Sequence, residues 1–164
     1  MKSKSLRIIL IFTTTLLSAC GFTLRGAADL APELQSLALI STDGNSDIYR
    51  ELSRSLEASN VTLLERSASD AYQLVVGNEQ SSERVLSVNS NARAGEYELS
   101  VSVPVQLRKG SASIFGPETL TIEKVYLADP NSAVAKAEER ELMEEEMRRE
   151  LVNQILRRLQ NLSL

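Results

Sequence analysis

Thirteen consecutive residues, Glu96 to Arg108, alternate strictly between apolar and polar positions, with Pro104 among the polar ones. A two-residue period sends successive side chains to opposite faces of a β-strand, so this strand buries one face and exposes the other. Such one-sided burial is typical of antiparallel sheets. Because Pro104 cannot donate a ladder hydrogen bond, we expect an edge position or a bulge there. The predicted buried set is Tyr97, Leu99, Val101, Val103, Val105 and Leu107.

The segments around this strand favour a β-meander. Residues 72–88 predict one long strand that is interrupted near Gly77, and the polar residues 89–95 fit a hairpin loop. A further strand is expected over residues 118–127, after a glycine-containing turn. The short apolar run at 37–40 predicts a first strand, well before the meander.

Two helices are expected. Asp47 is a suitable N-cap for a helix over residues 48–59, whose apolar residues recur every four positions. Asp129, followed by Pro130, predicts the start of a long final helix with the pairs Glu144–Arg148 and Glu145–Arg149. Its apolar stripe should cover the sheet, and consists of Val134, Ala137, Met143, Met147, Leu151, Ile155 and Leu159. The order β-α-β-β-β-α predicts an α+β fold, with two helices packed on one face of a mostly antiparallel four-stranded sheet.

The first 20 residues have the layout of a secretory signal. A basic start precedes an apolar run over residues 6–17, and the small residues Ser18 and Ala19 lead to Cys20, the one cysteine of the chain. A run of about 12 apolar residues is too short to span a bilayer. The pattern resembles a bacterial lipoprotein signal, in which the cysteine is acylated and becomes the mature N-terminus. An ordinary signal or a core helix with a chance cysteine is the alternative.

The predicted organisation is therefore a signal peptide over 1–19, a lipidated leader over 20–34 and one periplasmic domain over 35–164. Gly21 follows the cysteine where inner-membrane retention signals usually carry aspartate. By resemblance, this favours the periplasmic side of the outer membrane.

Composition restricts the function. Removal of the signal leaves 15 basic and 22 acidic residues, a formal charge of −7, which disfavours nucleic acid as a partner. The chain has no histidine. It therefore lacks Cys/His zinc sites and Ser-His or Cys-His nucleophile pairs, and we expect no enzyme activity, metal or cofactor.

Four cations are candidates for a local anion site on this acidic chain. Arg93 lies in the hairpin loop, Lys136 lies in the first turns of the long helix, and Arg84 and Arg108 lie on strands. Each could equally be an ordinary surface cation. The polar face of the sheet is predicted to be rich in hydroxyl groups, and such a face suits either water or the water-lined wall of a large β-barrel. Its members are Ser100, Ser102, Gln106, Thr119, Thr121 and Glu123.

Several short stretches resemble the LPS-assembly lipoprotein LptE family, also called rare lipoprotein B. They are the start of the mature chain, Gly21-Phe22-Thr23-Leu24-Arg25-Gly26, the hairpin and strand residues Ser87-Val88 and Ala94–Leu99, and the helix entry Asp129-Pro130-Asn131 with Ala133–Lys136. Together they span essentially the whole mature chain.

The resemblance implies two helices against a four-stranded sheet and a function that is not enzymatic. It implies a lipoprotein that sits within the LptD β-barrel, assists its assembly, binds lipopolysaccharide and helps pass it to the outer leaflet. Lys136 matches the helix-start lysine of the family, a candidate phosphate contact. The arginine that some members carry in the hairpin tip falls at Ser90, and Arg93 is the nearest cation.

Two rival functions remain open at this point. One is a periplasmic lipid-binding or transport-auxiliary lipoprotein that carries a lipid without a barrel partner, which would need an enclosed apolar cavity. The other is an envelope hydrolase, which the absence of histidine disfavours.

Overall fold

A computed structural model describes residues 30–66, 70–88, 94–127 and 133–163. Its elements comprise a short 3-10 turn, two helices and six strands. They are η1 (Pro32–Leu34), β1 (Ser36–Ser41), α2 (Asp47–Ala58), β2 (Thr62–Leu64), β3 (Tyr72–Val76), β4 (Gln80–Val88), β5 (Ala94–Lys109), β6 (Ala112–Leu127) and α3 (Ala133–Gln160).

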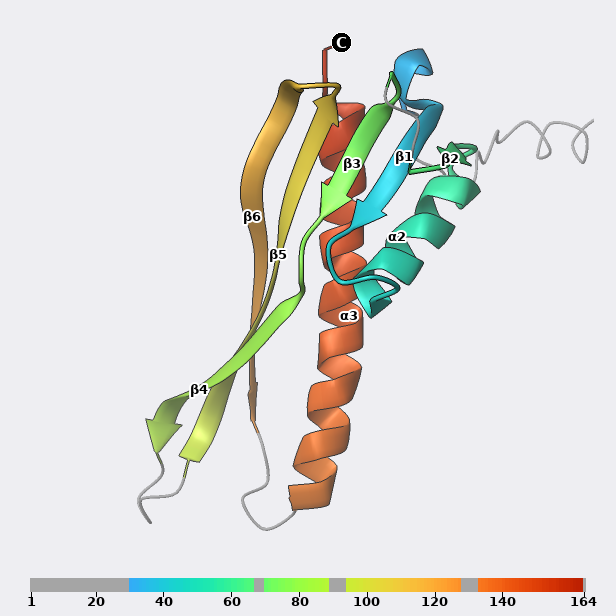
Figure 1. The fold of residues 1–164 in the computed structure, drawn as a ribbon. Coiled ribbons are helices and arrows are strands. Elements are labelled where there is room, and N and C mark those ends of the chain that lie inside the picture. The colour runs from blue at the N-terminus through green and yellow to red at the C-terminus, as the bar shows by residue number, and fades with distance from the viewer. Residues whose placement is uncertain (1–29, 67–69, 89–93, 128–132, 164) are drawn as a thin grey trace, which may run out of the picture.

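The six strands form one mixed sheet around β5 (Figure 1). On one edge of β5, β4 pairs with the N-terminal part of the strand and β3 pairs with the C-terminal part. On the other edge, β6 pairs with β5 along almost its whole length. All three pairings are antiparallel. Strand β1 pairs in parallel with both β2 and β3. The α+β class is confirmed, but the expected count of four strands was too low. The interruption expected near Gly77 is confirmed and separates two strands, β3 and β4, and residues 62–64 form a further strand that has no alternating pattern.

Pro104 explains the split. Strand β5 is central, so the expected edge position is wrong, whereas its register with β6 shifts between Val105 and Leu107, directly after Pro104, in line with the bulge expected as the alternative. Pro104 instead lies opposite the break between β3 and β4, where the Gly77 N–H donates to the Pro104 carbonyl at 2.8 Å. A proline needs no acceptor from its neighbour, so the neighbouring strand can leave the ladder here. A Cβ on Gly77 would lie 3.0 Å from the Pro104 ring, which favours glycine at this point.

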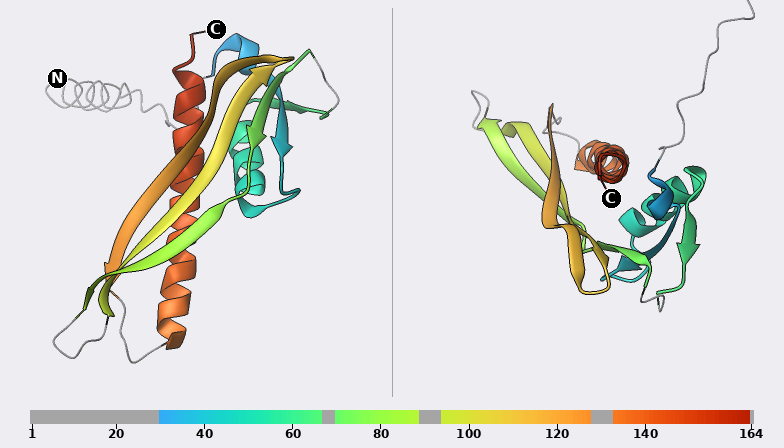
Figure 2. Two further views of the ribbon diagram at one scale, coloured as in Figure 1. Left: turned by 60° about the vertical axis from the view of Figure 1, so that its left-hand side comes forward. Right: turned by 90° about the horizontal axis from the view of Figure 1, so that it is seen from above.

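Both helices lie on the concave side of the curled sheet (Figure 2). The inward residues of β5 from Leu99 to Leu107 are buried, as the alternation predicts, and they pack with Ile48, Leu52 and Leu56 of α2. Helix α2 begins one residue earlier than expected, because Ser46 and not Asp47 is the N-cap residue. Leu30 and Leu34 are also in this core, so the end of the predicted leader packs on the domain.

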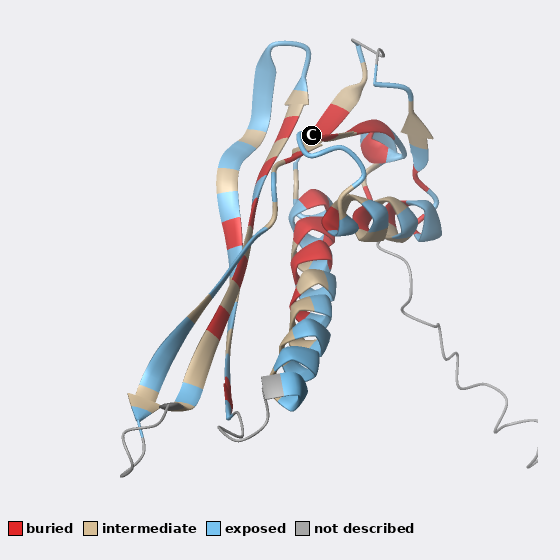
Figure 3. Cartoon of the chain, turned by 60° about the horizontal axis from the view of Figure 1, so that its bottom comes forward, coloured by how far each residue is buried: buried red, intermediate tan, exposed pale blue. Residues whose placement is uncertain are grey.

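Helix α3 is buried along only part of its length (Figure 3). Its buried residues are Met147, Leu151, Val152, Ile155, Leu156 and Leu159, all in the C-terminal half. The predicted stripe fails in the first turns, where Val134 and Ala137 are exposed; Leu142, which is outside that stripe, is 66% exposed. Polar residues, Lys136 and Arg140, occupy the positions that face the sheet there, so Val134 and Leu142 lie on other sides of the helix and stay exposed.

Candidate functional site

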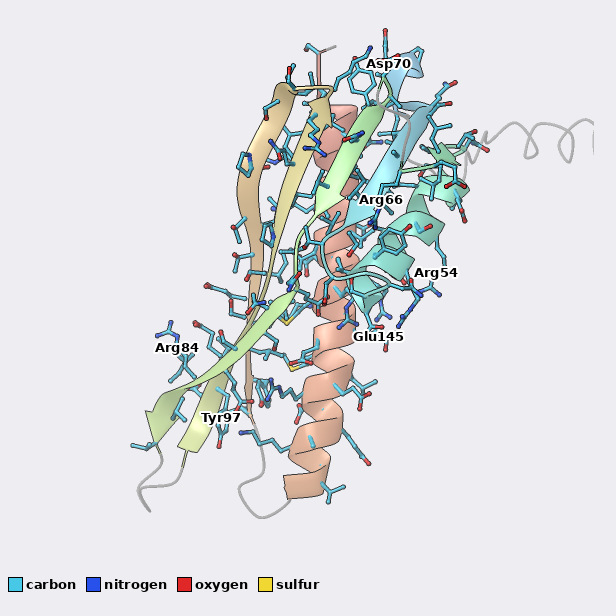
Figure 4. All side chains as sticks on the ribbon, viewed as in Figure 1. Arg54, Arg66, Asp70, Arg84, Tyr97 and Glu145 are labelled. Carbon is cyan, nitrogen blue, oxygen red and sulfur yellow. The ribbon has the colours of Figure 1, made fainter. Side chains whose placement is uncertain are left out.

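The structure does not bring the predicted cations together. Arg84 forms an ion pair with Glu98 on the convex face of the sheet, and its side chain projects away from α3 (Figure 4). Arg108 donates to Gln73 on the same face, ten residues further along β5, which is roughly 33 Å from Glu98 at strand geometry. Lys136 lies on the opposite, concave side. Cys20, Arg93, Asp129 and Pro130 are outside the described residues.

Lys136 belongs to a compact group that we call the Glu83 cluster (Glu83, Tyr97, Tyr126 and Lys136). The Lys136 Nζ donates to Glu83 Oε1 at 2.6 Å and lies 3.6 Å from the centre of the Tyr97 ring, a cation–π contact. The Tyr126 hydroxyl donates to the other oxygen of the Glu83 carboxylate. Tyr97 and Tyr126 stack with centroids 5.5 Å apart. Four elements, β4, β5, β6 and α3, thus each supply one side chain.

Electrostatics favours the charged forms of both ionic members. Burial alone would raise the pKa of Glu83, but the hydrogen bonds from Lys136 and Tyr126 outweigh it and hold that pKa below its usual value. Burial alone would lower the pKa of Lys136, but the hydrogen bond and charge of Glu83 raise it. Burial and the hydrogen bond to Glu83 both raise the pKa of Tyr126 well above its usual value. Lys136 is therefore an ammonium with a fixed counter-ion.

This cluster is missed by sequence reasoning because Glu83 and Lys136 are 53 residues apart. The sequence offers two signals, the face of β4 on which Glu83 lies and the opposite charges of Glu83 and Lys136. Neither signal specifies that these two side chains pair.

The same end of the molecule exposes apolar side chains. We call it the distal end (residues 83–88, 95–98, 123–127 and 134–142), at the bottom of Figure 1. Of eight large exposed hydrophobic residues among those described, seven lie here: Val85, Leu86, Val88, Val125, Leu127, Val134 and Leu142. They lie on both faces of the sheet and on α3, so this end of the molecule exposes apolar side chains on more than one side.

The convex face of the sheet is polar, as predicted. Cross-strand rows place Ser82 of β4 beside Ser100 of β5 and Glu123 of β6, and Gln80 beside Ser102 and Thr121. Thr119 is opposite Pro104, and Gln106 donates to Ser113 at 3.3 Å. The side chains of this face on β6, Thr119, Thr121 and Glu123, are exposed.

A charged groove of about 400 Å³ separates α2 from α3. Figure 4 labels Arg54 on α2 and Glu145 on α3, which both line it. Its positive and negative side chains pair mainly within each helix, as in Arg54–Glu51 and Arg149–Glu145. The predicted pair Glu145–Arg149 is confirmed, but Glu144 pairs with Arg140, at 3.0 Å, and not with Arg148.

Arg148 instead reaches across to the sheet. Its Nε and Nη2 each lie 2.8 Å from a carboxylate oxygen of Glu79, and both side chains are 17% exposed. This bidentate pair joins the middle of α3 to the chain between β3 and β4.

In the described part of the chain, no helix is long and apolar enough to cross a membrane, and no group of potential ligands has the arrangement of a metal site.

The chain is similar to known proteins over most of its length. A family model described as "LptE: Lipopolysaccharide-assembly" matches residues 34–159. An LPS-assembly lipoprotein LptE from Yersinia enterocolitica is 30% identical over 162 residues, covering 97% of this chain and 77% of the relative. Another, from Photorhabdus laumondii, is 27% identical and covers 97% and 87%.

Solved structures share the fold. The crystal structure of rare lipoprotein B from Shewanella oneidensis has a TM-score of 0.69 and 29% identity, covering 74% of this chain and 91% of that one. The solution structure of a lipoprotein B from Nitrosomonas europaea has a TM-score of 0.67 at 22% identity, covering 85% and 90%, and supports the fold alone.

Proposed function

Because this chain belongs to the LptE lipopolysaccharide-assembly family, we propose that it is an outer-membrane lipoprotein that plugs an LptD-type β-barrel and assists the assembly of that barrel. In this role it helps deliver lipopolysaccharide to the outer leaflet. Membership makes it a lipoprotein with a non-enzymatic part in lipopolysaccharide assembly. Acylation of Cys20 would confine the domain beside its partner and raise the effective concentration of the pair.

The polar convex face carries this proposal. One face of the sheet is sealed by two helices, whereas the other presents rows of serine, threonine and glutamine side chains along three long strands. The interior of a large outer-membrane barrel is polar and lined by water, so the serine, threonine and glutamine rows can lie against it. Val125 of β6, opposite Glu98, is the exposed apolar side chain that this face adds towards the distal end.

Lys136 is the described cation best suited to lipopolysaccharide. It is held at the distal end over the Tyr97 ring, whose cross-strand neighbour Val85 is an exposed apolar side chain, and this combination matches a ligand that carries both phosphates and acyl chains. Arg84 and Arg108 lie on the convex face, so in this proposal they contribute to binding separately or not at all. Arg93 stays a candidate contact from the hairpin loop.

A lipid carrier without a barrel partner is less well supported. Such a protein needs an enclosed apolar chamber. Three surface hollows of the described domain are open and are lined largely by polar and charged side chains of α2, α3 and the loop before α2.

Co-purification tests the barrel partner and the face that contacts it. The tagged, lipidated chain should recover a large β-barrel protein from outer membranes. Added bulk on the convex face, as in Thr121→Trp, should reduce that recovery, whereas Asn153→Trp on an exposed position of α3 serves as the matched control. Recovery of the wild-type chain without a barrel would reject the function, and equal recovery with both variants would reject the convex face as the contact.

Lipopolysaccharide binding is tested with Lys136→Gln. A neutral substitution is required, because charge reversal would set a second carboxylate beside Glu83. Binding unaltered by Lys136→Gln would remove Lys136 from the site.

A further inference from the structure

Lys136 already has an anionic partner. Its Nζ is 2.6 Å from Glu83 Oε1, and the two side chains are 28% and 17% exposed, so solvent screens the pair only in part. An ammonium has three donors, but here one face of the group is also taken by the Tyr97 ring at 3.6 Å. A phosphate that approaches Lys136 therefore meets a carboxylate in the position it would occupy.

Glu83 is held in that position by the surrounding strands. Its second carboxylate oxygen accepts from the Tyr126 hydroxyl, and Tyr126 is stacked on Tyr97. Tyr126 is 6% exposed, so the donor is fixed within the fold. The carboxylate is thus preorganised as a ligand for the lysine.

The contacts around this pair are polar and exchangeable. Ser81 donates to Glu144 at 2.5 Å, and Arg140 contacts both residues, at 3.0 Å from Glu144 and 3.4 Å from Ser81. The fully buried apolar residues of α3 start only at Met147. The first turns of α3 are therefore joined to β4 mainly by hydrogen bonds and ion pairs, which an anionic ligand can replace without opening the core.

We propose that Glu83 is an internal counter-ion that competes with the anionic ligand for Lys136, so that binding exchanges the Glu83–Lys136 pair for a phosphate–Lys136 pair. This inference rests on the proposed function, because it takes lipopolysaccharide as the ligand. The ligand class is a phosphomonoester carried by an amphiphile, since the exposed apolar side chain of Val85 is the cross-strand neighbour of Tyr97, on which Lys136 lies. The competition limits the affinity, as release of the ligand restores an ion pair within the protein.

Removal of the competitor should strengthen binding. An ion pair of this partial exposure is worth up to about 1 kcal/mol, so Glu83→Gln is expected to lower Kd for lipopolysaccharide about three- to sixfold. Lys136→Gln is expected to raise Kd about tenfold, because it removes a charge-assisted contact.

The experiment is a double-mutant cycle in the full-length lipidated chain, purified in detergent. Kd is measured for purified rough lipopolysaccharide with the wild type, Glu83→Gln, Lys136→Gln and the double variant. Glu118→Gln is the matched control: it makes the same change of charge, but its carboxylate pairs with Arg158 and lies opposite Val105, far from Lys136. Enzymatically dephosphorylated lipopolysaccharide and inorganic phosphate form two further arms.

The expected result is tighter binding with Glu83→Gln alone, no gain from the same substitution in the Lys136→Gln background, and no gain with Glu118→Gln. The gain should disappear with dephosphorylated lipopolysaccharide. A gain with inorganic phosphate of the same size would show that the phosphate alone suffices and would overturn the amphiphile as the ligand class.

Two failures are distinguishable. If Lys136→Gln leaves Kd unchanged, the assigned lipopolysaccharide contact is wrong and the proposed function loses this site. If Lys136→Gln weakens binding but Glu83→Gln does not strengthen it, or strengthens it equally in both backgrounds, the competition is wrong while the contact stands. Thermal melting of each variant checks the fold, and the conservative Glu83→Asp, which keeps a carboxylate, should bind no more tightly than the wild type.

Discussion

Two leucines of α3 offer a direct test of how this domain is held together. Leu151 is fully buried, whereas Leu142 is 66% exposed. Both stand in the interior of the same helix, so replacement by alanine changes helix propensity equally at each position. The two positions lie on opposite faces of the helix, so any difference between Leu151→Ala and Leu142→Ala reports the packing of its inward face against that of its outward face.

The expected magnitudes are well separated. Loss of a fully buried leucine side chain costs about 2–5 kcal/mol, because a cavity remains against the sheet. The same truncation at an exposed position changes the free energy of unfolding by about 0.5 kcal/mol or less. For a domain of this size, at about 3 °C per kcal/mol, Leu151→Ala should lower Tm by roughly 6–15 °C, and Leu142→Ala by less than about 2 °C.

Urea denaturation and thermal melting, both followed by circular dichroism at 222 nm, measure the two effects. An unchanged m-value would show that the unfolded states are comparable. Similar losses of stability at the two positions would refute the assignment of Leu151 to the buried face of α3 and of Leu142 to its exposed face. Leu142→Ala should also keep its fold while losing apolar surface at the distal end, which makes it useful in binding assays.

Three further predictions follow from individual contacts. Arg148→Ala should cost about 1–3 kcal/mol because it leaves the Glu79 carboxylate unpaired and mostly buried, whereas Arg149→Ala removes an exposed pair and should cost less than about 0.5 kcal/mol; urea unfolding compares them. The folded-state pKa of Glu83 is lowered, so its contribution to stability is present above its unfolded pKa and is lost as the pH falls through the folded value. The Tm difference between wild type and Glu83→Gln should then shrink below about pH 4.5, and a constant difference from pH 7 to 3 would contradict this sign. Gly116→Ala should destabilise by more than about 1 kcal/mol in the same unfolding assay, because φ is +73° and the new Cβ would lie 2.5 Å from a carbonyl oxygen of β5.

The parts of the fold that were predictable are those where one short segment carries its own periodicity. The alternation over 96–108 specifies which face of β5 is buried, and the four-residue repeat of Ile48, Leu52 and Leu56 specifies the buried stripe of α2. Strand β2 has three residues and pairs in parallel with β1, a contact that depends on the whole β-α-β connection. No local pattern encodes it.

Helix α3 shows the limit of such reasoning. Val134 and Leu151 look alike in the sequence, and the pattern of the helix alone predicts that both are covered. Coverage depends on which side of the helix faces the sheet, and in the first turns that side carries Lys136 and Arg140, which contact β4 and β5. Ion pairs are also hard to predict from the helix alone. Arg148 has a carboxylate four residues earlier on its helix but pairs with Glu79 of another segment.

The candidate site was predictable in part. Lys136 could be singled out from its place at the start of a helix and from a family resemblance, but its counter-ion could not. Arg84 and Arg108 were plausible partners for it by charge, and alternation along the strands places them on the other face of the sheet. Like charges on neighbouring strands therefore do not indicate a shared site by themselves. The pairing of the strands must first show that the side chains lie on the same face of the sheet.

The distribution of burial along α3 separates folding from ligand binding. The C-terminal half packs into the apolar core, to which Tyr126 of the sheet also belongs, so the free energy that holds the domain together depends little on the Glu83–Lys136 ion pair. The first turns contribute ion pairs and hydrogen bonds whose individual values are small and whose partners an incoming phosphate can replace. Because the two sets of contacts share few residues, their effects should add nearly independently. A substitution such as Leu151→Ala should therefore lower Tm and leave the affinity for lipopolysaccharide unchanged well below the melting temperature, whereas Glu83→Gln should change the affinity with little loss of Tm.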